Sequence, residues 1–179
     1  YDAVTVGYRP DETFSVYYAY LDRAKRIFGK GADSQVQREF DMSSHILEAQ
    51  YHPSKTVAAG LYAYLLGIDN SPGAASDTVG IWTSGSEQLG DDGLSFLWRG
   101  EFAQQFDNSK SPTSSNFNLM YTHLSGGIKM SGAGTVTVGY ESLEGNGSRG
   151  FSTPLATLHA HNGFADMFLS TPASGLTDL

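Results

Sequence analysis

Hydrophobic and polar residues alternate along much of the chain. The stretch 13–23 reads TFSVYYAYLDR, in which every second position from 14 to 20 is aromatic or aliphatic. Because successive side chains of a β-strand point to opposite faces, a strand here has one apolar face, formed by Phe14, Val16, Tyr18 and Tyr20. The core of a soluble protein and the hydrocarbon of a membrane would both accept such a face.

The same pattern predicts eight strands separated by turn residues. They cover residues 3–9, 13–23, 44–52, 56–66, 77–85, 94–105, 115–124 and 135–143. Proline, glycine, aspartate and serine are frequent in the links, as is typical of turns. We therefore expect an all-β fold with antiparallel strands, most of which have about the length that spans a bilayer when tilted.

Charged residues fall mainly on one face of the predicted strands. In the strand 94–105, the aromatic residues share one face, and Arg99 and Glu101 share the other. An arginine or lysine at the bilayer midplane costs roughly 2–4 kcal/mol, so only the first kind of face can meet lipid. The predicted lipid-facing set contains Val4, Val6, Phe14, Val16, Phe96, Trp98, Val136 and Val138. The predicted lumen-facing set contains Arg9, Tyr17, Glu48, Arg99, Glu101, Gln105 and Glu141.

The predicted links differ in length. The links at 9–12 and 53–55 are tight turns, whereas long loops are expected near 24–43, 67–76, 106–114 and 144–179. Alternating short and long links are typical of up-and-down membrane barrels, which have short periplasmic turns and long outer loops. The alternation weakens in the middle of the chain, where the links 86–93, 106–114 and 125–134 have similar lengths.

Composition narrows the choice of fold and partner. The 179 residues suffice for one domain, placed at 1–179, and glycine contributes 21 of them. Aromatic residues make up 12% and charged residues only 17%, which favours an all-β protein. The formal net charge of −8 argues against a nucleic-acid partner, and the absence of cysteine excludes disulfides. No apolar run of about 20 residues occurs, which excludes a transmembrane helix but not membrane strands.

Three features suggest chemistry, and none is specific. The stretch 145–150, GNGSRG, matches a dinucleotide-binding fingerprint, but FSTP follows it where a helix would have to begin, so we expect a flexible outer loop. His159 and His161, with Asp166, could approach a metal ion, yet nothing fixes their geometry. Serine, histidine and carboxylates are present, but no G-x-S-x-G elbow of a hydrolase is. We predict no metal site, no cofactor and no enzymatic activity.

The chain also contains one basic cluster, comprising Arg23, Lys25, Arg26 and Lys30. It begins where the second predicted strand ends and the first long loop starts. There it would either attract anionic solutes to the mouth of a pore or form an ordinary solvated loop. The sequence leaves both interpretations open.

Four stretches resemble the bacterial outer-membrane porins of the alginate-export type. They are YAYLDRAKRIFG at 18–29, FDMSSHILEAQY at 40–51, GYESLEGNG at 139–147 and the whole of 150–179, which ends in PASGLTDL. The resemblance implies an antiparallel outer-membrane β-barrel that passes hydrophilic or anionic solutes without a cofactor. Because family members are longer than this chain, and about eight strands leave an interior filled by side chains, we expect a fragment of a larger barrel.

The sequence therefore predicts a channel in the bacterial outer membrane. Its function would be passive diffusion or export of hydrophilic solutes, including anionic, saccharide-like ones. Its partners would be outer-membrane lipid and the passing solute, and the oligomeric state is left open. The mixed charges of the lumen-facing set favour a general or weakly selective pore over an alginate exporter. Two alternatives are a soluble eight-stranded β-barrel that binds a small apolar ligand and an outer-membrane hydrolase.

Overall fold

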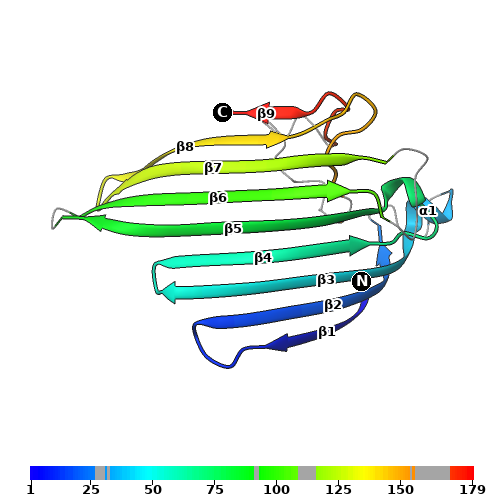
Figure 1. Ribbon diagram of the computed structural model, residues 1–179, viewed down its shortest axis with the longest axis horizontal. Coiled ribbons are helices and arrows are strands. Elements are labelled where there is room, and N and C mark those ends of the chain that lie inside the picture. Colours follow the sequence, from blue (N-terminus) through cyan, green and yellow to red (C-terminus); the bar gives the residue numbers. More distant parts are fainter. Residues whose placement is uncertain (27–30, 32, 91–92, 109–115, 154, 156–169) are drawn as a thin grey trace.

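The computed structural model describes residues 1–26, 31, 33–90, 93–108, 116–153, 155 and 170–179. Its strands form one antiparallel sheet, in which neighbours in sequence are neighbours in space (Figure 1). The strands are β1 (Asp2–Tyr8), β2 (Phe14–Lys25), β3 (Glu39–Ser54), β4 (Val57–Leu66), β5 (Ser76–Leu89), β6 (Leu94–Phe106), β7 (Asn118–Met130), β8 (Gly134–Leu143) and β9 (Leu176–Asp178). Two short helices, α1 (Gln35–Arg38) and η2 (Pro72–Ala74), lie in links. Among the described residues, no helix is long and apolar enough to cross a membrane.

The sheet is open. Within the described part of the chain β1 pairs with β2 alone and β9 with β8 alone, so these strands do not close into a barrel. The edge strands β1 and β9 lie at opposite ends of the row of strands (Figure 1). β9 covers only Glu141–Leu143 of β8, and the rest of β8 faces no further strand. The predicted all-β, antiparallel, up-and-down arrangement is confirmed, whereas a closed barrel is not formed by these strands alone.

Eight of the nine strands match predicted segments, but several bounds differ. β3 begins at Glu39, β5 continues to Leu89, and β7 runs to Met130. Ladder hydrogen bonds come from the backbone, so polar and glycine-rich sequence does not by itself stop strand pairing. The predicted loop 24–43 is therefore too long, since β2, α1 and β3 take up much of it, and β9 lies inside the predicted loop 144–179.

The longer strands make the alternation of links regular. Strands joined by the short links 9–13, 55–56, 90–93 and 131–133 meet at one end of the sheet, here called the short-turn end (Figure 1). Strands joined by the long links 26–38, 67–75, 107–117 and 144–175 meet at the other end, the long-link end. In the first short turn, the backbone N–H groups of Thr13 and Phe14 donate to Asp11 Oδ1 at 2.7 and 2.9 Å. A single aspartate thus fixes this reversal of the chain.

The register gives the sheet two chemically different faces. Tyr17, Glu48, Tyr62 and Tyr121 lie in one row of directly paired positions, and we call their side of the sheet the polar face. Phe14, Val16, Tyr18 and Tyr20 lie on the other side, the apolar face, as the alternation predicted. The polar face is the concave side of the sheet, as shown below.

Buried side chains gather on the polar face at the long-link end. One cluster consists of Ala24, Phe40, Met42, Leu66, Ile68 and Ala75. The other consists of Ala103, Phe117, Leu119, Leu143 and Phe151. The β8–β9 link connects them, because Phe151 belongs to the second cluster while Leu155 packs against the first. The Tyr1 hydroxyl also donates to the backbone oxygen of Leu155 at 3.3 Å.

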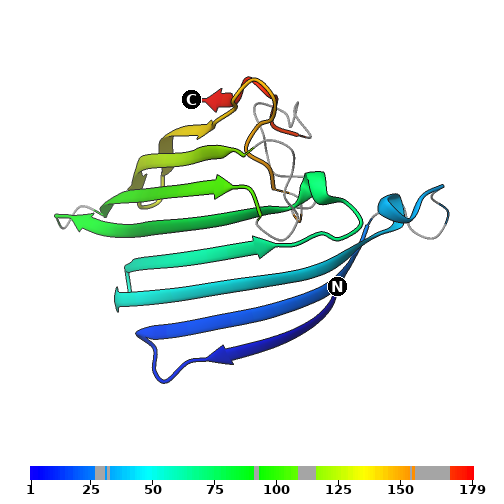
Figure 2. The ribbon, with the colours of Figure 1, turned by 45° about the vertical axis from the view of Figure 1, so that its right-hand side comes forward.

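This connection shows how strongly the sheet curves. An extended chain advances at most about 3.6 Å per residue, so the four steps from Phe151 to Leu155 cover no more than ~14 Å. In that distance the chain passes from residues of β6–β8 to residues of β2–β4. Contacts of the β8–β9 link thus reach both halves of the sheet at the long-link end, and the turned view shows the sheet bending (Figure 2).

Candidate functional site

The middle of the polar face carries charged and aromatic side chains from neighbouring strands. One row of paired positions contains Glu48, Tyr62 and Tyr121, and the next row toward the short-turn end contains Gln50, Trp82, Glu101, His123 and Glu141. Directly paired side chains lie about 4.5–5.5 Å apart at Cβ, so these rows form one continuous surface. It is the candidate functional site of the molecule.

Glu101 is the centre of this surface. Its Oε2 lies 2.6 Å from Arg99 Nη2, and its Oε1 accepts a hydrogen bond of 2.9 Å from the Tyr62 hydroxyl. The guanidinium of Arg99 also lies over the Trp82 ring, 5.8 Å from its centroid. Residues two apart on a strand share a face, which brings Arg99 to Glu101. Both carboxylate oxygens are held, so the group has a defined orientation.

Two glycines make room for the aromatic rings. Gly60 on β4 pairs with Trp82 on β5, and Tyr62 on β4 pairs with Gly80 on β5. A Cβ atom at Gly60 would overlap the Trp82 ring, and one at Gly80 would overlap the Tyr62 ring. Each ring therefore lies flat over the glycine of the neighbouring strand. This reciprocal packing positions the Tyr62 hydroxyl for Glu101.

The other carboxylates of the surface accept hydrogen bonds from neutral groups. Glu141 Oε1 accepts from the Tyr121 hydroxyl at 2.8 Å, and Glu48 Oε1 accepts from Gln50 Nε2 at 2.8 Å. Glu48 lies in one row, Glu101 and Glu141 share the next, and Arg99 lies in the row after that. Among the described residues of these three rows, Arg99 is the one lysine or arginine. Carboxylates thus outnumber cations on the middle of the polar face.

The predicted lumen-facing residues lie on one side of the sheet, with two qualifications. Tyr17, which is 41% exposed, pairs with Glu48, and both line a shallow groove together with Arg9 from the adjacent turn. Gln105 lies on the same face but is only 1% exposed, because the β8–β9 link covers it. It therefore cannot contact a solute in this arrangement, although its neighbours on β6 can.

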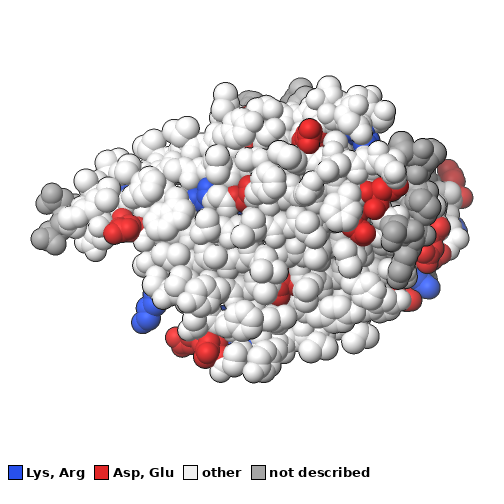
Figure 3. All heavy atoms as spheres, viewed as in Figure 1, with Lys and Arg blue, Asp and Glu red and all other residues white. Residues whose placement is uncertain are grey.

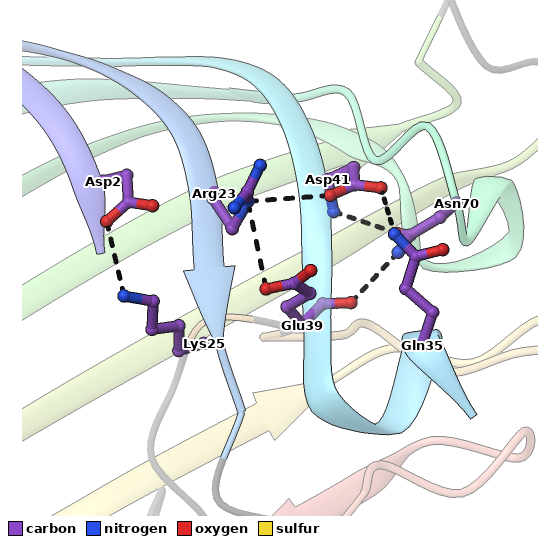
Figure 4. A network of polar contacts seen from close by, with 7 residues as sticks. All are labelled: Asp2, Arg23, Lys25, Gln35, Glu39, Asp41 and Asn70. Carbon is purple, nitrogen blue, oxygen red and sulfur yellow. Dashed lines mark hydrogen bonds and ion pairs between the residues drawn. The ribbon is translucent and has the colours of Figure 1, made fainter. Parts of the chain in front are cut away.

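The predicted basic loop cluster is a set of cross-strand contacts instead. Arg23 Nε lies 3.9 Å from Glu39 Oε2 and 3.7 Å from Asp41 Oδ1, and Lys25 Nζ lies 3.7 Å from Asp2 Oδ1 (Figure 4). Arg23 and Lys25 belong to β2, whose pairing with β3 places acidic partners opposite them. We call these five residues the charged collar. Its acidic residues on β3 alternate with buried ones, so they point away from the buried cluster.

Arg26, the third cationic position of the cluster, also differs from the expectation. Arg26 Nη1 donates to the backbone oxygen of Val36 at 2.9 Å, and its guanidinium lies 4.5 Å from the centroid of the Phe40 ring. Arg26 therefore anchors the β2–β3 link to the sheet. Lys30 lies outside the described residues.

The glycine-rich stretch 145–150 forms a tight hairpin. Asn146 Oδ1 accepts the backbone N–H groups of Ser148 and Arg149 at 3.0 and 3.1 Å, and Gly147 adopts a φ of 86°. Gly145 and Gly150 pair across the hairpin. Arg149 stacks on the Phe117 ring at 3.8 Å, where burial lowers its pKa and Asp107 partly offsets that effect. An ordered turn, rather than a flexible loop, is thus present.

No group of three or more potential metal ligands occurs in the part of the chain that the structure describes. The motif His159-Ala160-His161 and Asp166 lie outside that part. Searches against protein families, curated proteins and solved structures found no match to this chain. The function must therefore be argued from the two faces of the sheet.

Sequence reasoning missed several residues of the candidate site, namely Tyr62, Trp82, Tyr121 and His123. A usable signal was present for β4, where Leu61, Tyr62, Ala63 and Tyr64 alternate. Aromatic residues fit either a lipid interface or a polar lumen, so the strand pattern alone assigned them to neither set. Only the register with charged residues on neighbouring strands places them on the polar face.

Proposed function

We propose that the sheet is part of the wall of a β-barrel in the bacterial outer membrane. Its polar face would border a water-filled channel for passive diffusion of hydrophilic solutes, and its apolar face would meet lipid. The observation that carries the proposal is the exposed apolar face. Its large side chains include Val4, Leu61, Ile81, Leu124, Val136 and Val138, which are 54–74% exposed.

Exposure of this kind is costly in water. Burial of apolar surface is worth roughly 25 cal/mol per Å², and contiguous exposed apolar patches mark contacts with protein or membrane. The buried clusters are on the opposite face, so these side chains are not a core. A soluble barrel that binds an apolar ligand would turn the same residues inward. The outward position of these residues therefore favours contact with lipid over a soluble, ligand-binding barrel.

The distribution of charge supports the same orientation. The charged collar lies at the ends of β1, β2 and β3 that belong to the long-link end (Figure 4). In the space-filling view, most of the visible surface over the middle of the strands is uncharged (Figure 3). An apolar band bounded by polar residues, with short turns at one end and long links at the other, is typical of outer-membrane barrels.

In this proposal the open edges at β1 and β8 are paired by further strands. The resemblance to alginate-export porins, which are longer than this chain, implies such a barrel. A larger circumference also leaves room for water, since about eight strands give an interior filled by side chains. Carboxylates prevail on the middle of the polar face, so we propose neutral and cationic hydrophilic solutes rather than anionic ones.

Single-cysteine labelling tests the membrane assignment, because the natural chain contains no cysteine. Val138 and Thr137 are neighbours on β8 and point to opposite faces. In lipid vesicles, we expect Thr137→Cys to react with a water-soluble maleimide and Val138→Cys to be protected. Val138 is 74% exposed in the isolated sheet, so both variants should react in a protein that stays in buffer. Equal labelling in the presence of lipid would rule out the proposal.

The charge preference gives a separate prediction. In planar bilayers with a salt gradient, the reversal potential of the closed barrel that contains this sheet should show a preference for cations. The double variant E48Q/E141Q should reduce that preference, because it removes two carboxylates from the polar face. The control E12Q/E87Q removes the same charge from positions at the short-turn end, off the candidate site. Equal effects of the two double variants would contradict the assignment of Glu48 and Glu141 to the channel.

A further inference from the structure

The β8–β9 link does more than connect two strands, because part of it lies across the concave face. Phe151 is buried against residues of β6, β7 and β8, and its ring lies 5.7 Å from that of Tyr121. Leu155 packs against the cluster from β2, β3 and β4. The described part Gly150–Thr153, which we call the crossing segment, therefore occupies the space enclosed by the curled sheet.

Gln105 fastens this segment to the sheet. Its Nε2 donates to the backbone oxygen of Ser152 at 2.7 Å and to Thr78 Oγ1 at 3.0 Å. Its Oε1 accepts the backbone N–H of Ser152 at 2.9 Å and the Ser152 hydroxyl at 3.3 Å. The side-chain amide thus meets both backbone polar groups of Ser152. Because Gln105 is buried, loss of these contacts would leave polar groups unpaired.

The segment is also held at its base. The hairpin 145–150 precedes it, and the backbone N–H of Gly147 donates to the oxygen of Ala173 at 2.8 Å. A Cβ atom at Gly150 would lie 2.5 Å from the backbone oxygen of Pro172, so residues 171–175 pack directly on the hairpin. The crossing segment is therefore supported on one side by the hairpin and on the other by Gln105.

We infer that the crossing segment is a built-in constriction and that Gln105 is a positioning residue that sets the upper size of solutes. This inference rests on the proposed channel. At the long-link end the two buried clusters and the segment fill the concave side, whereas the polar face toward the short-turn end stays open. A solute that moves along the concave side of the sheet meets the segment. The amide of Gln105 fixes the distance between the segment and β6.

The test compares Q105L with Q104L. Leucine at 105 keeps the side chain's size but loses all four contacts, whereas Gln104 lies on the opposite face and contacts Asn118. In proteoliposomes, swelling is measured with neutral sugars of increasing size. We expect Q105L to raise the rate for the largest permeant sugar about twofold or more, since passage depends on the narrowest width. Q104L should behave as the unmodified chain.

A cross-linked variant covers the case in which Q105L does not fold. The pair Gln105→Cys and Ser152→Cys, once bridged by a short bifunctional thiol reagent with a reducible bond, should hold the segment, and reduction should then raise the same swelling rate. Unchanged size limits in Q105L, and in the cross-linked pair before and after reduction, would overturn the inference while the channel stands. If the unmodified closed barrel that contains this sheet shows no sugar-dependent swelling at all, the proposed channel itself fails.

Discussion

Leu124→Arg is expected to prevent stable insertion of the chain into lipid. Leu124 lies in the middle of β7 on the apolar face and is 55% exposed. An arginine near the bilayer midplane costs roughly 2–4 kcal/mol, which is a large share of the stability of a typical domain. The measurement is the fraction of chain that floats with vesicles after refolding, together with the free energy of unfolding by urea from those vesicles.

The matched control is His123→Arg. His123 is the neighbouring residue, but it lies on the polar face between Glu101 and Glu141 in the register. The same added charge there faces carboxylates and water, so insertion should be retained. If the apolar face met water instead, Leu124→Arg would be an ordinary surface change within about ±0.5 kcal/mol. Insertion of both variants to the same extent would count decisively against the lipid assignment.

The fold could largely be read from alternation, because a period of two both defines a strand and assigns its faces. The assignment held for β2, where Phe14, Val16, Tyr18 and Tyr20 share a face. Strand ends were less accessible to this reasoning. The residues Ser125, Gly126 and Gly127 suggest a loop by composition, yet β7 continues through them because its partners β6 and β8 supply the hydrogen bonds.

The parts of the site that escaped prediction depend on contacts between distant segments. Gln105 alternates correctly with Arg99 and Glu101, so its face was predictable, but its burial depends on Ser152, 47 residues away. Arg23 and Lys25 looked like a basic loop because their acidic partners are far along the chain and become neighbours only through strand pairing. Local sequence carries no signal for such pairings unless the register is known.

Gly80→Ala is expected to destabilise the folded sheet by about 1–3 kcal/mol, the usual cost of overpacking. The new methyl group would overlap the Tyr62 ring, which would have to turn away and release Glu101. Of its two partners Tyr62 and Arg99, Glu101 would then retain only Arg99. The measurement is the free energy of unfolding by denaturant, taken in the same lipid or detergent for every variant.

Two comparisons isolate the cause of that loss. Gly139→Ala is also a change in a strand on the polar face, but its methyl group would lie 3.6 Å from the nearest atom, the Cβ of Ser125, which is ordinary contact. It should therefore be nearly neutral. In a Tyr62→Ala background the cost of Gly80→Ala should shrink, because the ring that it displaces is gone, and the difference measures the coupling of the two residues. An equal cost in both backgrounds would mean that Tyr62 does not lie over Gly80, and the position of the hydroxyl that holds Glu101 would lose its structural basis.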